Sequence, residues 1–346
     1  MNNHNILGID LAKNFFQVCA LNQANKVQFN RKLTRNKLAE FMQQQEPTLV
    51  AMEACSSSNY WARKFEEMGH TVKLVPAQHV KPFVKGNKDD RNDAVAICEA
   101  ALRPNMKFAM IKTHVQQDLQ MIHRIRQLHV KQATAISNQI RGYLAEYGII
   151  VQKQVAHLLG VLPNIINNEK NDLTPLSRQL LLSQYHVLNS TREKVSEFNQ
   201  HIEHCNKQNE YCQRLQALPG IGPIISSALY AAVGNGSQFS KGRQMSAWIG
   251  LTPAHFGTGG KNTNVNTTKK GDHYLRTLLI HGARTVVSWS DRKTDPLSCW
   301  IQRLVARRGK RKAYVALANK LTRAAWRILQ GDEYDLTKIS AQPLSH

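Results

Sequence analysis

Long apolar runs are absent from this sequence of 346 residues. A membrane-spanning helix needs about 18 or more consecutive apolar residues, and no such stretch occurs. The first ten residues, MNNHNILGID, also lack the basic segment and apolar core of a secretory signal. We therefore expect no membrane partner and no secretion, and we predict a cytoplasmic protein.

Cysteine pairs of the CxxC type are absent as well. Residues 201–212 do contain His201, His204, Cys205 and Cys212, but their spacing fits no standard zinc pattern. We interpret these four as ordinary helix residues. The six cysteines are scattered, as is usual in a reducing compartment: Cys19, Cys55, Cys98, Cys205, Cys212 and Cys299.

Acidic residues are scarce. The chain has 24 Asp and Glu against 46 Lys and Arg, which leaves a net charge of +22. Between residues 211 and 331 only Asp272, Asp291 and Asp295 are acidic. This imbalance predicts a polyanionic partner, with nucleic acid preferred over an anionic membrane surface, and it places the main binding region in the last third of the chain.

The first hundred residues alternate short apolar runs with helical stretches. Their pattern predicts the order β-β-β-α-β-α-β-α, a mixed sheet covered by helices and therefore an α/β domain. The expected strands are residues 6–12, 15–21, 26–33, 48–55 and 71–77, and the expected helices are residues 38–45, 58–69 and 90–102.

Long helical periodicity follows. Apolar residues recur every three or four positions over residues 113–147 and again over 181–205, with a loop-like stretch at 162–175 between them. This pattern indicates a helical hairpin or coiled-coil arm. An intramolecular bundle and an oligomerisation arm fit it equally well.

The third region is basic and is expected to be mainly helical. It begins with LPGIGPIISSAL, which predicts two helices joined by a glycine turn, similar to a helix-hairpin-helix motif. We therefore expect four segments: a catalytic domain at 1–112, an arm at 113–210, a basic domain at 211–331 and a tail at 332–346.

Four carboxylates in the first region call for an explanation. Asp10 interrupts the apolar strand ILGIDLA, where an uncompensated charge costs several kcal/mol. Glu53 ends the strand at 48–55, and Asp90 and Asp93 share one face at the start of a helix. If the first and fourth strands are neighbours, these side chains converge.

Carboxylates that crowd together require a cation. Hard divalent ions such as Mg²⁺ or Mn²⁺ take oxygen ligands, and two such ions can clamp a phosphodiester during strand transfer. Taken singly, Asp90 could be a helix cap and Glu53 a solvated side chain. Taken together, the four indicate a catalytic metal site formed by Asp10, Glu53, Asp90 and Asp93.

The motifs around these residues resemble a known family. GIDLAK, MEAC and DDRNDA resemble the DEDD motif of transposases of the insertion-sequence 110/1111 group, which includes Piv-type DNA invertases. LPGIGPIISSALYAAVG, SAWIGLTP, GTGGKN and KKGDHYLRTLLIHGAR match that family's C-terminal domain in order and spacing. The resemblance covers nearly the whole chain.

The resemblance implies a fold and an activity. The first domain would be a RuvC-like member of the ribonuclease H fold, and the protein a nucleoid-associated, site-specific recombinase that moves its own insertion sequence. The implied partners are DNA, as element ends and target, and a structured element-encoded guide RNA (bridge or seeker RNA). Because recombination joins several DNA ends, we expect a homodimer or tetramer.

The family uses a serine nucleophile in the basic domain. The matching position here is Thr258, in the stretch GTGGKNTNVNTTKKG, which we interpret as a flexible, basic, hydroxyl-rich loop. The β-branch of Thr258 restricts the approach of its hydroxyl to phosphorus. Thr252 and Ser246 are alternative hydroxyls. Either one of the three serves as nucleophile or this copy is impaired.

Nucleic-acid contacts are expected throughout the basic domain. The glycine turn would let backbone amides approach phosphate. We interpret Trp248, Trp289, Trp300 and Trp326 as core anchors. The expected nucleic-acid-binding residues are Gly220, Gly222, Lys261, Lys269, Lys270, Arg276, Arg307, Arg308, Lys310, Arg311 and Lys312, with Arg284 on the same helix as Arg276.

Three other functions stay open from the residues alone. A RuvC-like junction resolvase would use activated water and leave Thr258 a bystander. A sugar kinase or actin-like ATPase can also begin with a strand like GIDLAK, but it needs a later glycine-rich phosphate loop such as DxGxxT, and none is evident. A catalytically silent nucleic-acid-binding protein would retain the basic domain without strand cleavage.

Overall fold

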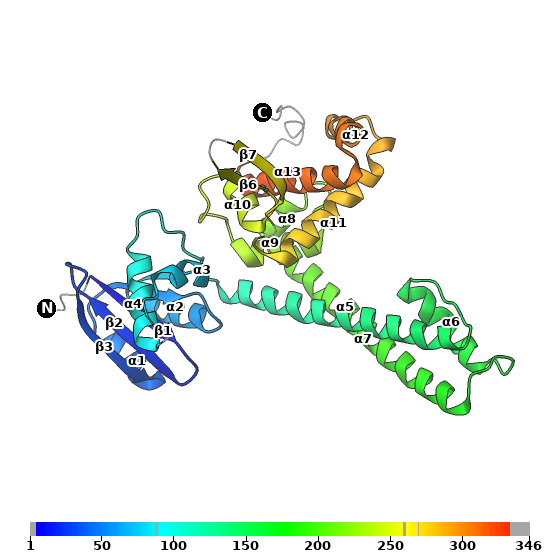
Figure 1. The fold of residues 1–346 in the computed structure, drawn as a ribbon, viewed down its shortest axis with the longest axis horizontal. Helices are drawn as coiled ribbons and strands as arrows, with labels where there is room; N and C mark the ends of the chain where they lie inside the picture. The colour runs from blue at the N-terminus through cyan, green and yellow to red at the C-terminus, as the bar shows by residue number, and fades with distance from the viewer. Residues whose placement is uncertain (1–4, 87–88, 259–260, 269, 333–346) are drawn as a thin grey trace. The chain divides into compact units, whose positions relative to one another are not determined.

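The computed structural model describes residues 5–86, 89–258, 261–268 and 270–332, without the side chains of residues 255–258 and 261–266. The chain forms two compact units, Met1–Thr113 and His114–His346 (Figure 1). Each unit has its own hydrophobic clusters.

In the described residues of the first unit, five strands and the helices α1, α2 and α4 follow one another in the order that the sequence predicts. The short helices α3 and η1 were not expected. The elements are β1 (Ile6–Leu11), β2 (Phe15–Leu21), β3 (Val27–Thr34), α1 (Arg35–Gln43), β4 (Leu49–Glu53), α2 (Ser58–Glu67), β5 (Thr71–Val75), α3 (Ala77–Val80), η1 (Lys81–Phe83) and α4 (Asp90–Ala101).

The five strands form one mixed sheet in the order β3-β2-β1-β4-β5. β1, β2 and β3 are joined as antiparallel hairpins, whereas β4 pairs with β1 and β5 pairs with β4 in parallel. This mixed sheet, with helices on its faces, is consistent with the ribonuclease H fold that the resemblance implies.

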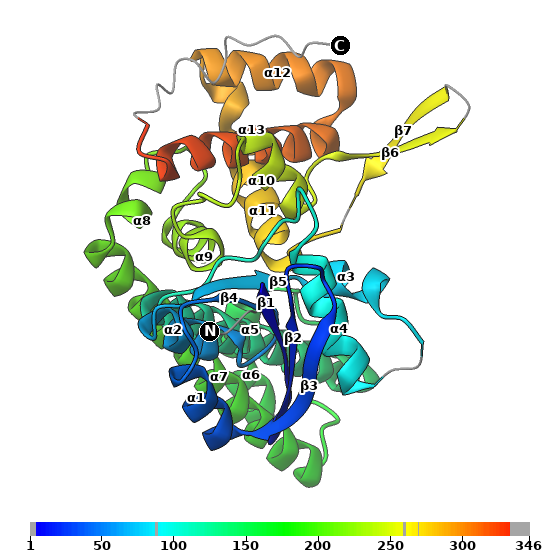
Figure 2. The ribbon, with the colours of Figure 1, turned by 90° about the vertical axis from the view of Figure 1, so that its left-hand side faces the viewer.

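Alternation along β1 divides the core into two layers. Leu7 and Ile9 pack with α1 and α2 on one face, where Trp61 and Phe65 are fully buried. Ile6 faces the other side and packs with α4. The ribbon shows α4 across the sheet from α1 and α2 (Figure 2). Because side chains alternate along a strand, Gly8 and Asp10 share the α4 face with Ile6.

Gly8 allows α4 to approach the sheet closely. A Cβ at this position would lie 2.3 Å from the Cys98 Sγ atom and 2.6 Å from the Ala94 carbonyl oxygen. The second contact is to backbone, which cannot turn away as a side chain can. The missing side chain at Gly8 therefore sets the distance between α4 and β1.

The arm of the second unit is a pair of long helices. α5 (His114–Glu146) and α7 (Pro175–Gln208) pack against each other, and α6 (Val155–Asn167) lies beside their outer end (Figure 1). α6 occupies part of the segment expected to be a loop. Its apolar residues Leu158, Leu162 and Ile166 are buried against the hairpin, which compensates for the proline inside the helix.

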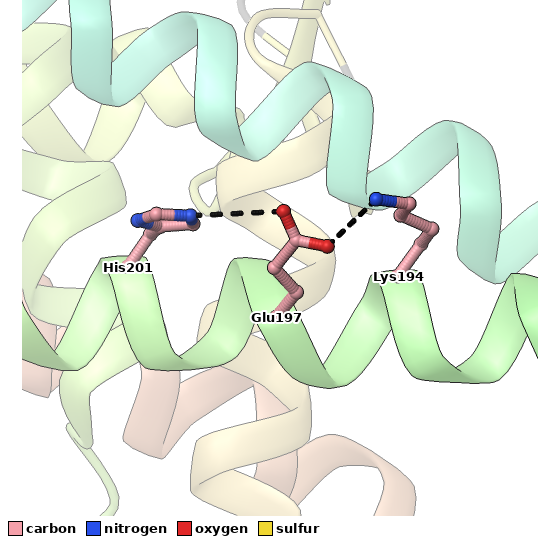
Figure 3. A network of polar contacts seen from close by, with 3 residues as sticks. All are labelled: Lys194, Glu197 and His201. Carbon is pink, nitrogen blue, oxygen red and sulfur yellow. Dashed lines mark hydrogen bonds and ion pairs between the residues drawn. The ribbon is translucent and has the colours of Figure 1, made fainter.

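Exposed ion pairs run along α7. Lys194 lies 2.8 Å and His201 3.9 Å from the two carboxylate oxygens of Glu197 (Figure 3). Exposed pairs of this kind stabilise a protein by less than about 1 kcal/mol. They mark a solvated face, and His201 therefore lies on the surface of the arm.

Buried polar contacts join the arm to the basic lobe, residues 210–332. The His123 ring on α5 hydrogen-bonds the Tyr274 hydroxyl at 3.0 Å and the Ser227 hydroxyl at 2.9 Å. Burial lowers the pKa of His123 to about 4, so the ring is neutral near pH 7. Gln116 adds a hydrogen bond to the Tyr230 carbonyl at 3.0 Å.

The basic lobe is mainly helical, as expected. None of the helices in the described residues is long and apolar enough to span a membrane. The elements are α8 (Glu210–Leu215), α9 (Pro223–Val233), α10 (Gly242–Ile249), β6 (Pro253–Thr258), β7 (Lys261–Thr267), α11 (His273–Trp289), η2 (Ser290–Arg292), α12 (Pro296–Arg308) and α13 (Lys310–Leu329).

Replacing Gly8 with alanine tests the close approach of α4. We expect Gly8→Ala to lower the free energy of unfolding of the first unit by about 1–3 kcal/mol, because the added methyl group overpacks the interface. Gly160→Ala is the matched control, since a Cβ there meets nothing within 4 Å. Thermal unfolding followed by circular dichroism measures both; a Gly8→Ala midpoint equal to that of wild type would contradict the packing.

Candidate active site

Two strand ends place Asp10 beside Glu53. β1 and β4 are parallel, with Gly8 opposite Ala51 and Ile9 opposite Met52. The next pair in this register is Asp10 and Glu53. Ala51 packs on the α4 face, so Glu53, two residues further, emerges on that face together with Asp10.

The first turn of α4 adds the other two carboxylates. Asp89 caps the helix by accepting a hydrogen bond from the Arg91 amide at 3.3 Å. Asp90 and Asp93 follow in the first turn, where the helix dipole favours negative charge. Because α4 packs against β1 at Gly8, this turn comes close to Asp10.

The charges of these residues act on one another. Burial raises the pKa of Asp10 to about 6 from an ordinary value of 3.8, and the negative charges of Asp93, Asp90 and Glu53 add to this effect. A hydrogen bond from the Leu11 amide opposes it. All four predicted carboxylates therefore lie within electrostatic range at one edge of the sheet.

A hydrogen-bonded pair that the sequence did not single out anchors the first turn of α4. Gln17 on β2 is buried, and its amide donates to the Asn30 side-chain oxygen at 2.6 Å. Asn30 on β3 donates in turn to the Arg91 carbonyl oxygen at 3.0 Å. The signal in the sequence was a polar residue at an inward-facing position of each strand. Through these contacts the sheet fixes the position of the first turn of α4, which carries Asp90 and Asp93.

The donor set suits a hard divalent cation. Carboxylate oxygens are the ligands that Mg²⁺ and Mn²⁺ prefer, and a cation would relieve the repulsion that raises the pKa of Asp10. Within the described part of the chain, no three His, Cys, Asp or Glu side chains are already arranged as a group that could hold a metal ion. The carboxylates are thus neighbours, but they do not form a closed ligand set.

The two glycines of the turn in the basic lobe have different surroundings. Gly220, with φ +80°, packs against α11, because a Cβ there would lie 2.7 Å from the Gly282 carbonyl oxygen. Gly220 therefore has a role in helix packing that the sequence did not indicate. A Cβ on Gly222 would meet nothing within 4 Å, and this residue precedes the first turn of α9.

Arg276 is a structural residue in this fold, which corrects its expected phosphate contact. Its side chain is buried on α11, and one guanidinium nitrogen donates to the Ile249 carbonyl oxygen at 3.1 Å. The sequence carried a signal for this, because Arg276 lies three, seven and eleven residues before the buried Leu279, Ala283 and Val287. Such spacing places all four on one helix face.

The segment expected to be a flexible loop is a β-hairpin. β6 and β7 are antiparallel, and Thr258 pairs with Lys261 at the tip. The side chains of Thr258 and Lys261, and the whole of Lys269, lie outside the described residues. Lys270 is described and is exposed.

The alternative hydroxyls differ in access. Ser246 is completely buried, and its hydroxyl accepts a hydrogen bond from the Asn319 side-chain nitrogen at 2.7 Å. It cannot reach DNA without unfolding of α10. Thr252 is half-buried at the base of the β-hairpin.

An exposed basic cluster occupies the junction of α12 and α13. Its residues are all exposed, and Gly309 separates the two helices. The cluster consists of Arg307, Arg308, Lys310, Arg311 and Lys312.

Two of the expected tryptophan anchors lie at the surface instead. Trp248 is 40 % and Trp289 is 53 % exposed, and the Arg292 guanidinium lies 4.6 Å from the Trp289 ring centre. Trp300 and Trp326 pack against the core of the basic lobe, as predicted.

Asp10→Asn tests the crowding of the carboxylates. Because the folded-state pKa is raised, wild-type stability falls as pH rises from about 4 to about 6, and the penalty persists above that. In chelator-treated buffer at pH 7.5, Asp10→Asn should therefore increase the free energy of unfolding by about 1–2 kcal/mol, allowing for screening at this partly exposed site. The gain should vanish near pH 4; a gain that is independent of pH would contradict the electrostatic cause. Urea titrations at the two pH values measure it.

Two family models match the chain. A DEDD model of the IS110 group, described as "Transposase", matches residues 7–149, which contain all four carboxylates. A model described as "Transposase IS116/IS110/IS902 family" matches residues 212–297 in the basic lobe.

Similar proteins extend the match over nearly the full length. A probable family 20 transposase of Pseudomonas aeruginosa is 43 % identical over 324 residues, which is 93 % of this chain and 96 % of that protein. The transposase for insertion sequence element IS1111A of Coxiella burnetii is 41 % identical over 328 residues, 95 % of this chain and 90 % of that protein. The transposase for insertion sequence element IS1328 of Yersinia enterocolitica is 34 % identical over 328 residues, which is 94 % of this chain and 97 % of that protein. The chain therefore belongs to the insertion-sequence transposases of the IS110 family.

Proposed function

We propose that this transposase cleaves and rejoins DNA strands at the edge of the sheet where Asp10 meets Glu53, Asp90 and Asp93. The observation that carries the proposal is the convergence of the four carboxylates: Asp10 and Glu53 lie at the ends of the paired strands β1 and β4, and Asp90 and Asp93 lie in the first turn of α4. Burial and the other three charges together raise the pKa of Asp10. The mutual repulsion of the carboxylates destabilises the fold. Such a destabilising arrangement is typical of a functional site, here one that acts on a phosphodiester.

The carboxylates would hold the catalytic cation. Asp10, Glu53 and Asp93 are the proposed ligands, with Asp90 completing the set. A bound Mg²⁺ or Mn²⁺ supplies charge stabilisation at the scissile phosphate. The protein contributes the register of β1 and β4, which aligns Asp10 with Glu53, and the anchored first turn of α4.

The basic lobe would supply the nucleophile. The Thr258 hydroxyl oxygen attacks phosphorus, a new threonine–phosphate ester bond forms, and the original P–O bond breaks. The departing DNA oxygen takes up a proton and becomes a hydroxyl group. The hydroxyl group of a second DNA end then attacks the ester and releases Thr258. Because Thr258 lies at the tip of the β6–β7 hairpin, its backbone projects from the helical core.

Nucleic acid would bind across the basic lobe. The exposed cluster at the junction of α12 and α13 supports this, since no acidic residue occurs from 296 to 331. We include Gly222, Lys261, Lys269 and Lys270 in the contact surface and leave out Gly220 and Arg276, which pack inside the lobe. The ligands are DNA and a structured guide RNA encoded by the element.

The active enzyme would be an assembly of two or four chains whose compact units dock. The carboxylates and Thr258 belong to different compact units, so they must dock, within one subunit or between subunits, for strand transfer. The arm has exposed apolar side chains on both long helices, including Met121, Leu128, Leu176 and Leu180. A homodimer or tetramer that buries them agrees with the need to hold several DNA ends.

Trapping a protein–DNA adduct tests the mechanism. Wild-type protein with Mg²⁺, the guide RNA transcript and a labelled duplex carrying one element end should give a protease-sensitive adduct on a denaturing gel. Asp10→Asn and Thr258→Ala should each reduce the adduct at least about a hundredfold, because each removes a reacting or charge-stabilising group. Thr258→Ser should retain it, because serine keeps the hydroxyl without the β-branch.

Two outcomes would change the assignment. Cleavage without any adduct under all metal conditions favours a RuvC-like endonuclease or junction resolvase that uses water. An adduct that survives Thr258→Ala but is lost in Thr252→Ala moves the nucleophile to Thr252. If Asp10→Asn retains full cleavage and rejoining, the carboxylate site itself is rejected.

A further inference from the structure

We propose that Phe15 and Lys32 form a subsite for the DNA nucleotide next to the scissile phosphate. This proposal rests on the function assigned above to Asp10 and its neighbours. The subsite lies within the first unit and uses residues outside the DEDD motif. Lys32 would contact a phosphate of the reacting strand, and the Phe15 ring would pack on its sugar or base.

Strand register connects the subsite to the carboxylates. Asp10 on β1 pairs with Gln17 on β2, and Gln17 pairs with Lys32 on β3. The three residues therefore form one row on the α4 face of the sheet. Two inter-strand spacings separate the backbones of Asp10 and Lys32, which is roughly 10 Å, a separation that suits a flanking phosphate and not the scissile one.

Phe15 completes the subsite from the start of β2. It lies two residues before Gln17 and therefore faces the same side of the sheet. Phe15 is 46 % exposed, and the Lys32 Nζ atom lies 4.4 Å from the centre of its ring. An aromatic ring and a cation thus stand together in solvent at the edge of the sheet where β1 and β4 end.

The electrostatics of this edge favour a polyanionic strand at Lys32. Four carboxylates nearby repel phosphate, so a positive side chain beside them helps to hold a DNA strand that approaches Asp10. Gln17, which lies between Asp10 and Lys32, is buried and engaged with Asn30. Lys32 is the first exposed cation along this row.

A purely structural role makes a different prediction. Lysine stems often cover apolar rings while the charge remains in water, and an exposed cation–π contact stabilises a protein by only about 0.5–1 kcal/mol. If Lys32 only shields Phe15, the Lys32→Met variant should bind DNA like wild type, because methionine keeps an unbranched apolar stem. If Lys32 binds phosphate, Lys32→Met should bind DNA more weakly.

Lys32→Met therefore separates the two roles. With Ca²⁺ in place of Mg²⁺, the variant should bind the labelled element-end duplex about three- to tenfold more weakly. The slope of log Kd against log salt concentration should decrease by about the amount expected for one phosphate contact. In Mg²⁺, the loss should appear in KM more than in kcat. Phe15→Ala should weaken binding by about tenfold through lost stacking.

Lys26→Met is the matched control. Lys26 is an exposed lysine in the turn at the other end of the same β2–β3 hairpin, roughly 20 Å from the level of Phe15. Its removal changes net charge by the same amount, and binding should stay within about twofold of wild type. If Lys26→Met and Lys32→Met lose equal DNA affinity, the effect comes from net charge alone, and the proposed subsite is rejected.

Position-specific crosslinking gives an independent readout. With a photoreactive benzoylphenylalanine in place of Phe15, crosslinks should map to the nucleotides adjoining the cleavage point. Crosslinks elsewhere on the duplex, or none, would overturn the proposal. If Asp10→Asn abolishes cleavage but Lys32→Met binds and cleaves DNA like wild type, this subsite is rejected while the proposed function is retained.

Discussion

Repulsion among carboxylates at the carboxyl ends of β1 and β4 is the constraint around which the first unit is organised. Parallel pairing of these strands brings Asp10 and Glu53 to the same edge, and the close approach of α4 at Gly8 adds Asp90 and Asp93. Burial, and after it the charges of Asp93, Asp90 and Glu53, raise the pKa of Asp10 to about 6, so this arrangement is costly when Asp10 is ionised. The surrounding core is large enough to support it, because both faces of the sheet bury apolar layers.

Rigid backbone supports the charged edge. The relay from Gln17 through Asn30 to the Arg91 carbonyl fixes the start of α4 relative to the sheet. The second unit follows the same logic, since the buried His123 ring joins α5 to α9 and α11. In both units, neutral polar groups in the interior hold the elements that carry exposed charge, and the charged groups themselves remain accessible to a ligand.

Local patterns in the sequence predicted the first unit well, and long-range contacts explain where prediction failed. Short apolar runs revealed the strands, and the expectation that the first and fourth strands are neighbours brought Asp10 and Glu53 together. The packing of Gly220 against Gly282 could not be read from neighbouring residues. The spacing along α11 did indicate that Arg276 is buried, but not that it binds the Ile249 carbonyl. The hydroxyl-rich segment before Lys270 was taken for a loop, since β6 and β7 lack the usual apolar alternation.

Cation binding tests the central claim most directly. Free Mn²⁺ can be followed by electron paramagnetic resonance during titration of the wild-type protein and of Glu53→Gln, Asp93→Asn and the distant control Glu40→Gln. If the carboxylates converge on an ion, Glu53→Gln and Asp93→Asn should each weaken Mn²⁺ binding by about tenfold or more, and the control should match wild type. Equal Mn²⁺ binding by all four proteins would contradict a metal site at this edge.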